Sequence, residues 1–131
     1  MSLLSKQRHA SSRSKSSGNG KRKIKFRDRR RSESGNYFSA TKMAENDESV
    51  PMRRRGGNVT ARLRKAGSVN LLTKDGYKHA KIKGVLESKD NRNFARQNII
   101  TKGTIINTDM GKAVVTNRPG RDGAVTAKLV E

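Results

Sequence analysis

The sequence predicts an all-β protein: a small barrel-like or sandwich domain with one short helix, preceded by a long basic N-terminal extension. Apolar and polar residues alternate with a period of two at several places after residue 58, as in half-buried strands. Gly-rich turns separate these runs at short spacing, which is typical of small barrels and sandwiches. Apolar content also rises along the chain, from 13 residues in the first 55 to 27 in the other 76.

The extension is expected to span residues 1–52 and the compact domain residues 53–131. Residues 1–55 carry 16 basic and 5 acidic side chains. So few apolar groups cannot offset a backbone ordering cost of about 1–2 kcal/mol per residue. The run 21–31 holds eight cations and one acid, Asp28. Such a run is typical of an arm that nucleic acid orders, although a solubilising or nuclear-targeting tail is the alternative.

The first strands of the domain are expected at residues 59–64 and 69–72. The second of these runs ends at Asp75-Gly76, a strong hairpin signal. In the strand that follows, Ala80, Ile82 and Leu86 share one parity. We therefore expect these three side chains to face the core.

The short helix is expected within residues 88–97, where alternation stops and Ser88 or Asp90 can act as the N-cap. Phe94 is expected to fill the core. The later strands are expected at 99–100, 104–108, 112–117 and 124–130, with turns at 109–111 and 119–123.

The formal net charge is +20, from 31 Lys and Arg against 11 Asp and Glu. Because so small a body repels itself unless counter-charge is supplied, we expect a polyanionic partner. The absence of Cys excludes disulfides, thiolate zinc sites and Cys nucleophiles. No apolar run reaches about 18 residues and no secretion signal is evident, so an intracellular protein without a membrane partner is expected.

Catalysis and metal binding find no support in the residue pattern. His9 and His79 have no orienting acid nearby, and the acids have no metal-ligand spacing. Residues 18–21 lack the spacing of a phosphate loop. We expect no cofactor, no metal, no small-molecule substrate and no enzymatic activity.

Arg53-Arg54-Arg55 precede Gly56 and Gly57, two residues that let a backbone approach phosphate without a Cβ in the way. An ordinary flexible hinge is the alternative. Only two of the five aromatic residues, Tyr77 and Phe94, lie in the domain, so readout of single-stranded bases is poorly supported. Recognition of a folded polyphosphate surface by shape and charge is favoured.

Three segments carry a family resemblance: Arg55-Gly56-Gly57-Asn58, residues 91–103 (NRNFARQNIITKG) and residues 116–123 (TNRPGRDG). The sequence from residue 53 onward resembles the eukaryotic-type protein eight of the small ribosomal subunit, a family shared by archaea and eukaryotes. The chain is short and lacks a large insertion before its last strands, which resembles archaeal members more than eukaryotic ones. Residues 29–43 depart from the family pattern.

The resemblance implies a structural constituent of the cytoplasmic ribosome. Its partners would be small-subunit ribosomal RNA and neighbouring ribosomal proteins. A ribosome-assembly factor with the same domain is the first alternative, and a DNA-compacting chromatin protein is the second. The candidate RNA contacts are Arg13, Lys15, Lys21, Arg22, Lys23, Lys25, Arg27, Arg29, Arg30 and Arg31 in the arm; Arg53, Arg54, Arg55, Gly56, Gly57 and Asn58 at the base of the body; Arg92, Arg96, Asn98 and Lys102 on a second face; and Arg118 in a third.

Overall fold

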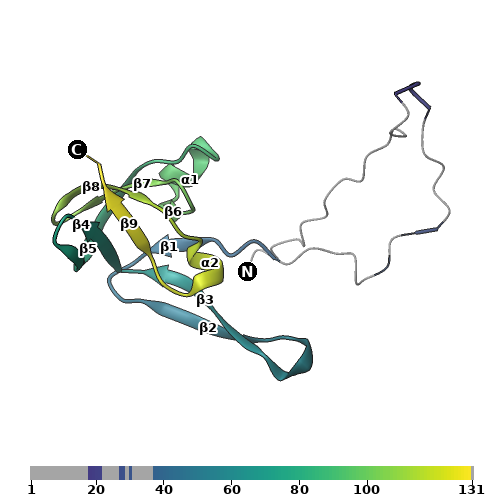
Figure 1. The fold of residues 1–131 in the computed structure, drawn as a ribbon, viewed down its shortest axis with the longest axis horizontal. Helices are drawn as coiled ribbons and strands as arrows, with labels where there is room; N and C mark the ends of the chain where they lie inside the picture. Colours follow the sequence, from purple (N-terminus) through teal and green to yellow (C-terminus); the bar gives the residue numbers. More distant parts are fainter. Residues whose placement is uncertain (1–17, 22–26, 29, 31–36, 131) are drawn as a thin grey trace. The chain divides into compact units, whose positions relative to one another are not determined.

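The computed structural model describes residues 18–21, 27–28, 30 and 37–130. The chain divides into two compact units, Met1–Phe38 and Ser39–Glu131. Every strand and helix of the described residues belongs to the second unit (Figure 1).

The second unit is built mainly of strands, which confirms the predicted all-β class. Its elements in chain order are β1 (Thr41–Met43), β2 (Glu48–Arg53), the 3-10 turn η2 (Arg55–Gly57), β3 (Val59–Ala66), β4 (Ser68–Thr73), β5 (Gly76–Glu87), α1 (Arg92–Arg96), β6 (Ile99–Ile100), β7 (Ile105–Thr108), β8 (Gly111–Val115), α2 (Pro119–Asp122) and β9 (Thr126–Leu129).

Five strands close into a barrel in the order β4-β5-β7-β8-β9 (Figure 1). The predicted hairpin is confirmed, because β4 and β5 pair antiparallel across the turn at Lys74 and Asp75. The barrel closes where β9 lies parallel to β4, with Leu71 opposite Ala127.

The other four strands form a sheet in the order β2-β3-β1-β6, in which β2 is an edge strand. β2 pairs antiparallel with β3, and the short β1 lies parallel to β3 on its other side. The sequence placed the start of the compact domain at residue 53, whereas the second unit starts at Ser39. β1 has only three residues, too few to show a hydrophobic pattern in the sequence. Its Thr41 is polar but fully buried, and its hydroxyl donates a hydrogen bond of 2.7 Å to the Leu63 carbonyl.

The four-stranded sheet and the barrel share one hydrophobic core. Leu63 of β3 and Ile100 of β6 belong to the same buried cluster as Leu71, Ile106 and Val115 of the barrel. The strand expected at residues 59–64 is confirmed, but of its alternating apolar residues only Leu63 reaches the core, since Val59 is 64% exposed and Ala61 is exposed as well.

Two expectations about the core are wrong. Leu86 is 48% exposed, because β5 shifts register between Ile82 and Gly84 and again between Val85 and Glu87. These irregularities turn Val85 toward the core instead. Phe94 is only half-buried and lies outside the buried cluster.

The expected short helix is α1, but its N-cap is neither Ser88 nor Asp90. The Asn91 side chain accepts a hydrogen bond of 2.9 Å from the Asn93 amide and caps the helix. A second one-turn helix, α2, occupies the segment expected to be a turn. It starts at Pro119 and ends at Asp122, and Gly123 follows as the C-cap in a left-handed conformation with φ of 78°.

Candidate nucleic-acid interface

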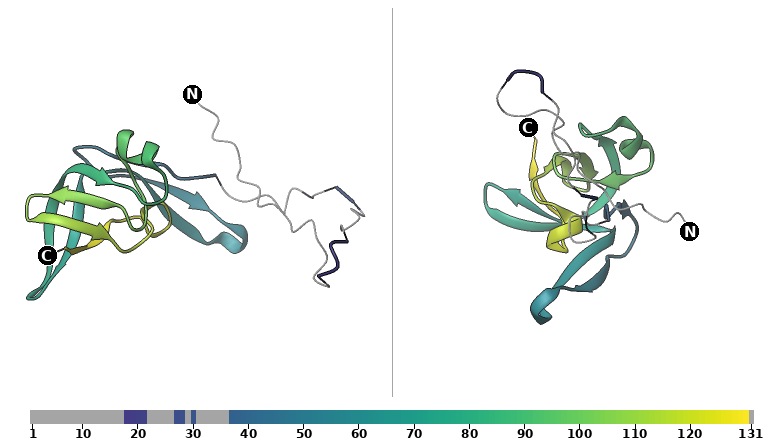
Figure 2. Two further views of the ribbon diagram at one scale, coloured as in Figure 1. Left: turned by 90° about the horizontal axis from the view of Figure 1, so that it is seen from above. Right: turned by 90° about the vertical axis from the view of Figure 1, so that its right-hand side faces the viewer.

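The β2–β3 hairpin carries the Arg- and Gly-rich motif at its end, and Figure 2 shows this hairpin projecting from the barrel. The Arg54 amide donates a hydrogen bond of 2.7 Å to the Asn58 carbonyl and closes the loop. Gly56 and Gly57 both have φ of 79°, a backbone conformation that side chains other than glycine rarely adopt. The sequence motif therefore builds a defined loop at the hairpin end.

The backbone of this loop is open to an incoming group. Gly56 and Gly57 are exposed, and a Cβ built on either would have no atom within 4 Å. A phosphate can therefore approach the backbone here without steric hindrance. Arg53 and Arg55 flank this open backbone and are exposed as well.

Two arginines lie close together on one face of the hairpin. Arg54 Nε donates a hydrogen bond of 3.3 Å to Thr60 Oγ1, and Arg62 lies two residues further along β3 on the same side. Burial lowers the pKa of Arg62 from its usual value, and the positive charge of Arg54 lowers it further. Because guanidinium groups stay protonated at neutral pH, these two positive charges repel each other and favour a bound anion.

Arg62 and Arg64 were missed as candidates from the sequence. Arg62 directly precedes the buried Leu63, so it projects from the other side of β3. Arg64 is exposed where β3 shifts register against β2, and its charge acts on Glu48 of β2. The alternation along β3 therefore places Arg62 on the face of Thr60, to which Arg54 donates its hydrogen bond. We refer to Arg54 and Arg62 as the arginine face.

The second predicted face lies in and after α1. Arg92 and Arg96 are exposed and four residues apart on the helix, so they project on one side. Lys102 is exposed at a tight turn that Thr101 and Thr104 close by hydrogen bonds. Asn98 also has a structural role, because it adopts φ of 53° and its carbonyl accepts a hydrogen bond from the Met43 amide.

The third candidate, Arg118, lies at the start of α2. It is the N-cap of α2, and its amide donates a hydrogen bond of 2.9 Å to the Asp122 carboxylate. The helix α2 packs on β3, and a Cβ built on Gly123 would lie 3.1 Å from that of Ala61. Arg118 therefore extends from an element that packs against the hairpin.

Three of the predicted arm contacts fall among the described residues. Lys21 and Arg30 are exposed, and Arg27 donates a hydrogen bond of 3.1 Å to the Asp28 carbonyl. The remaining arm candidates lie outside the described residues, namely Arg13, Lys15, Arg22, Lys23, Lys25, Arg29 and Arg31.

His79 contacts a side chain of the neighbouring strand β4. It lies on the exposed side of β5, where its Nδ1 is 3.1 Å from the amide oxygen of Asn70. Within the part of the chain that the structure describes, no three His, Asp or Glu side chains gather in a way that could hold a metal ion. No helix among those residues has the length and apolar character needed to cross a bilayer.

The described unit is thus a small β-barrel protein with a projecting basic hairpin and further exposed cations. The family model described as ribosomal protein S8e matches residues 10–130. The chain belongs to this family of ribosomal proteins.

Curated relatives named small ribosomal subunit protein eS8 agree with this assignment. The protein from Pyrobaculum aerophilum is 40% identical over 119 residues, which cover 89% of this chain and 90% of the relative. The protein from Sulfolobus acidocaldarius is 44% identical over 121 residues, 86% of this chain and 94% of the relative. The protein from Ignicoccus hospitalis is 46% identical over 99 residues, 74% and 76% of the two chains.

Proposed function

We propose that this chain is a structural constituent of the small ribosomal subunit that binds ribosomal RNA and catalyses no reaction. It acts in the cytoplasmic ribosome. The names of its relatives support the small subunit, and the net charge of +20 supports a polyanionic partner. The observation that carries RNA binding is the β2–β3 hairpin, which combines an open glycine backbone with the arginine face.

The chemistry of the arginine face matches RNA phosphate. An arginine presents a planar fork of donors that grips phosphate oxygens with two hydrogen bonds, and hydrogen bonds between charged groups are the strongest in proteins. An RNA backbone brought between Arg54 and Arg62 would also relieve the repulsion that lowers the pKa of Arg62. We infer that the hairpin holds phosphates while the arm and the α1 segment add further contacts.

The double variant Arg54→Gln with Arg62→Gln tests this proposal. Its affinity for protein-free small-subunit ribosomal RNA should fall at least about tenfold, because each charged hydrogen bond is worth about 1.5–3 kcal/mol. Filter binding at fixed salt measures the loss. The double variant Lys74→Gln with Lys81→Gln is the matched control, since it removes the same charge from exposed positions of the β4–β5 hairpin.

An equal loss in both double variants would show that only net charge matters and would contradict a defined contact at the hairpin. Equal binding of the wild-type protein to duplex DNA at matched salt would favour the chromatin alternative instead.

A further inference from the structure

The barrel carries a row of side chains that the proposed RNA contacts do not include. The strand registers place Tyr77, Leu72, Lys128, Val114 and Ile105 side by side across β5, β4, β9, β8 and β7. We refer to these five residues as the outer row. Four of the five are apolar.

The outer row faces away from the core. The chain neighbours Leu71, Ala113 and Ala127 have no exposed surface, and side chains alternate between the two faces of a strand. Tyr77 is 69% exposed and Leu72, directly opposite, is 39% exposed.

The C-terminal end of β9 enlarges this apolar surface. Val130 lies two residues beyond Lys128, on the same side of the strand. It is 49% exposed, and its amide donates a hydrogen bond of 2.9 Å to the Lys112 carbonyl. The exposed cations Lys112 and Lys128 therefore lie beside the apolar side chains.

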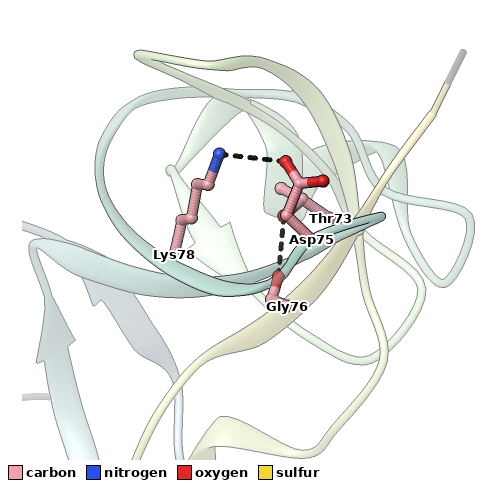
Figure 3. A network of polar contacts seen from close by, with 4 residues as sticks. All are labelled: Thr73, Asp75, Gly76 and Lys78. Atoms are coloured by element: carbon pink, nitrogen blue, oxygen red, sulfur yellow. Dashed lines mark hydrogen bonds and ion pairs between the residues drawn. The ribbon is translucent and has the colours of Figure 1, made fainter.

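The turn next to Tyr77 and Leu72 is held in one conformation (Figure 3). Thr73 Oγ1 donates a hydrogen bond of 2.7 Å to the Gly76 carbonyl, and Lys78 lies 3.5 Å from the Asp75 carboxylate. Asp75, the acid of this turn, is thus paired with Lys78. The backbone that carries Leu72 and Tyr77 is thus ordered before a partner binds, which lowers the entropic cost of binding.

The chemistry of the outer row differs from that of the hairpin. The hairpin cations are arginines beside open backbone, which suits phosphate. The outer row combines aliphatic and aromatic side chains with lysines, whose long stems can lie along apolar surface while their ammonium groups reach outward. Aliphatic groups such as Leu72 and Val130 gain from contact only where the partner is itself apolar, which an RNA backbone is not.

We propose that the outer row, together with Val130, docks a protein surface that has an apolar centre and carboxylates at its rim. The carboxylates would pair with Lys128 and Lys112, and Tyr77 and Leu72 would be buried against the apolar centre. Large exposed aromatic residues with apolar neighbours are typical anchors of protein interfaces. This proposal rests on the proposed place in the small subunit, where the partner would be a neighbouring protein.

The full-length double variant Leu72→Ser with Tyr77→Ser tests the proposal in two assays. The affinity with which assembled small subunits retain the variant should fall at least about fivefold, which corresponds to losing one interface anchor. Binding to protein-free small-subunit ribosomal RNA should stay at the wild-type level. The matched control is Leu86→Ser with Met110→Ser, which removes two other exposed apolar side chains, 48% and 44% exposed, and should change neither result.

A photocrosslinking residue at Tyr77 gives an independent measurement that does not depend on how the double variant folds. In assembled subunits it should link to a protein segment that contains both apolar and acidic residues. A link to RNA, the lack of any link, unchanged retention of the double variant, or an equal loss on protein-free RNA would each overturn the proposal. Loss of RNA binding by the hairpin variant is a separate result, so failure here leaves the proposed function untouched.

Discussion

At the scale of single residues, Gly67 fixes how the sheet meets the barrel. It lies between β3 and β4, and its amide donates a hydrogen bond of 2.6 Å to the Asp47 carboxylate. A Cβ built on Gly67 would lie 2.2 Å from the Glu45 carbonyl oxygen. The loop before β2 therefore packs directly on this glycine, with backbone against backbone.

Replacement of Gly67 should consequently destabilise the unit. Gly67→Ala should lower the free energy of unfolding by about 1–3 kcal/mol, because the clashing atoms are backbone atoms that cannot move aside alone. Gly84→Ala is the matched control, since a Cβ there meets no atom within 4 Å. Chemical denaturation compares the two, and equal stability of both variants would contradict the close packing at Gly67.

Asp47 predicts a pH dependence. Partial burial opposes ionisation of this carboxyl, but the Ser68 hydroxyl, the Gly67 and Ser68 amides and nearby His79 outweigh that effect and lower its pKa. A folded pKa below the unfolded one gives stability that is present above the unfolded pKa and is lost as pH falls through the folded pKa. The stability difference between wild type and Asp47→Ala should therefore be full at neutral pH and shrink below about pH 4. Thermal melts of both proteins across pH check this, and a constant difference would rule out the carboxylate as the cause.

At the scale of elements, β5 shows where strand parity fails. The alternation of Ala80 and Ile82 correctly predicts the inward face of its first part. The register shifts that follow put Val85 against the core and expose Leu86. Bulges of this kind depend on the partner strand, so the sequence of β5 alone could not reveal them.

The exchange of inward and outward positions between Val85 and Leu86 predicts different effects of the two substitutions on stability. Val85→Ala should lower the free energy of unfolding by about 1 kcal/mol, because it removes methyl groups that pack against the core. Leu86→Ala should change it by less than about 0.5 kcal/mol, as surface substitutions usually do. The opposite order of the two variants in chemical denaturation would support the unbroken parity that the sequence suggests.

Local signals made much of the fold and of the candidate site predictable. Asp75-Gly76 predicted the β4–β5 hairpin. The triple arginine before two glycines predicted a basic segment with open backbone, but the sequence placed it at the start of the domain and did not predict the strand β2 that makes it the end of a hairpin. Contacts between distant segments were not predictable in this way. The parallel pairing of β1 with β3 and the packing of α2 on β3 join residues far apart in the sequence, so neither contact was expected.

At the scale of the whole molecule, charge should dominate binding. If six to ten phosphates are contacted, affinity for ribosomal RNA should fall by about 10³–10⁵ between 50 and 200 mM salt, because bound counterions are released on association. Binding measured across this range tests the prediction. A nearly flat curve would contradict an electrostatic mechanism for a chain of net charge +20.

The basic arm and the folded unit that starts at Ser39 should contribute separately to RNA binding and to stability. Removal of residues 1–31 should weaken RNA binding, since it removes much of the basic arm. The melting temperature of the barrel and sheet should stay nearly unchanged, because these residues precede the unit that starts at Ser39. Calorimetry of the shortened chain measures this, and loss of a cooperative transition would show that the arm is needed for folding.

The position of β2 at the edge of its sheet bears on how the protein avoids pairing with itself. An edge strand offers unpaired backbone groups to any other strand and invites intermolecular sheet growth. Pro51 lies in the middle of β2 and lacks an amide hydrogen, and the arginines at the hairpin end repel a second copy. The projecting hairpin is thereby a poor template for pairing with a strand of a second copy.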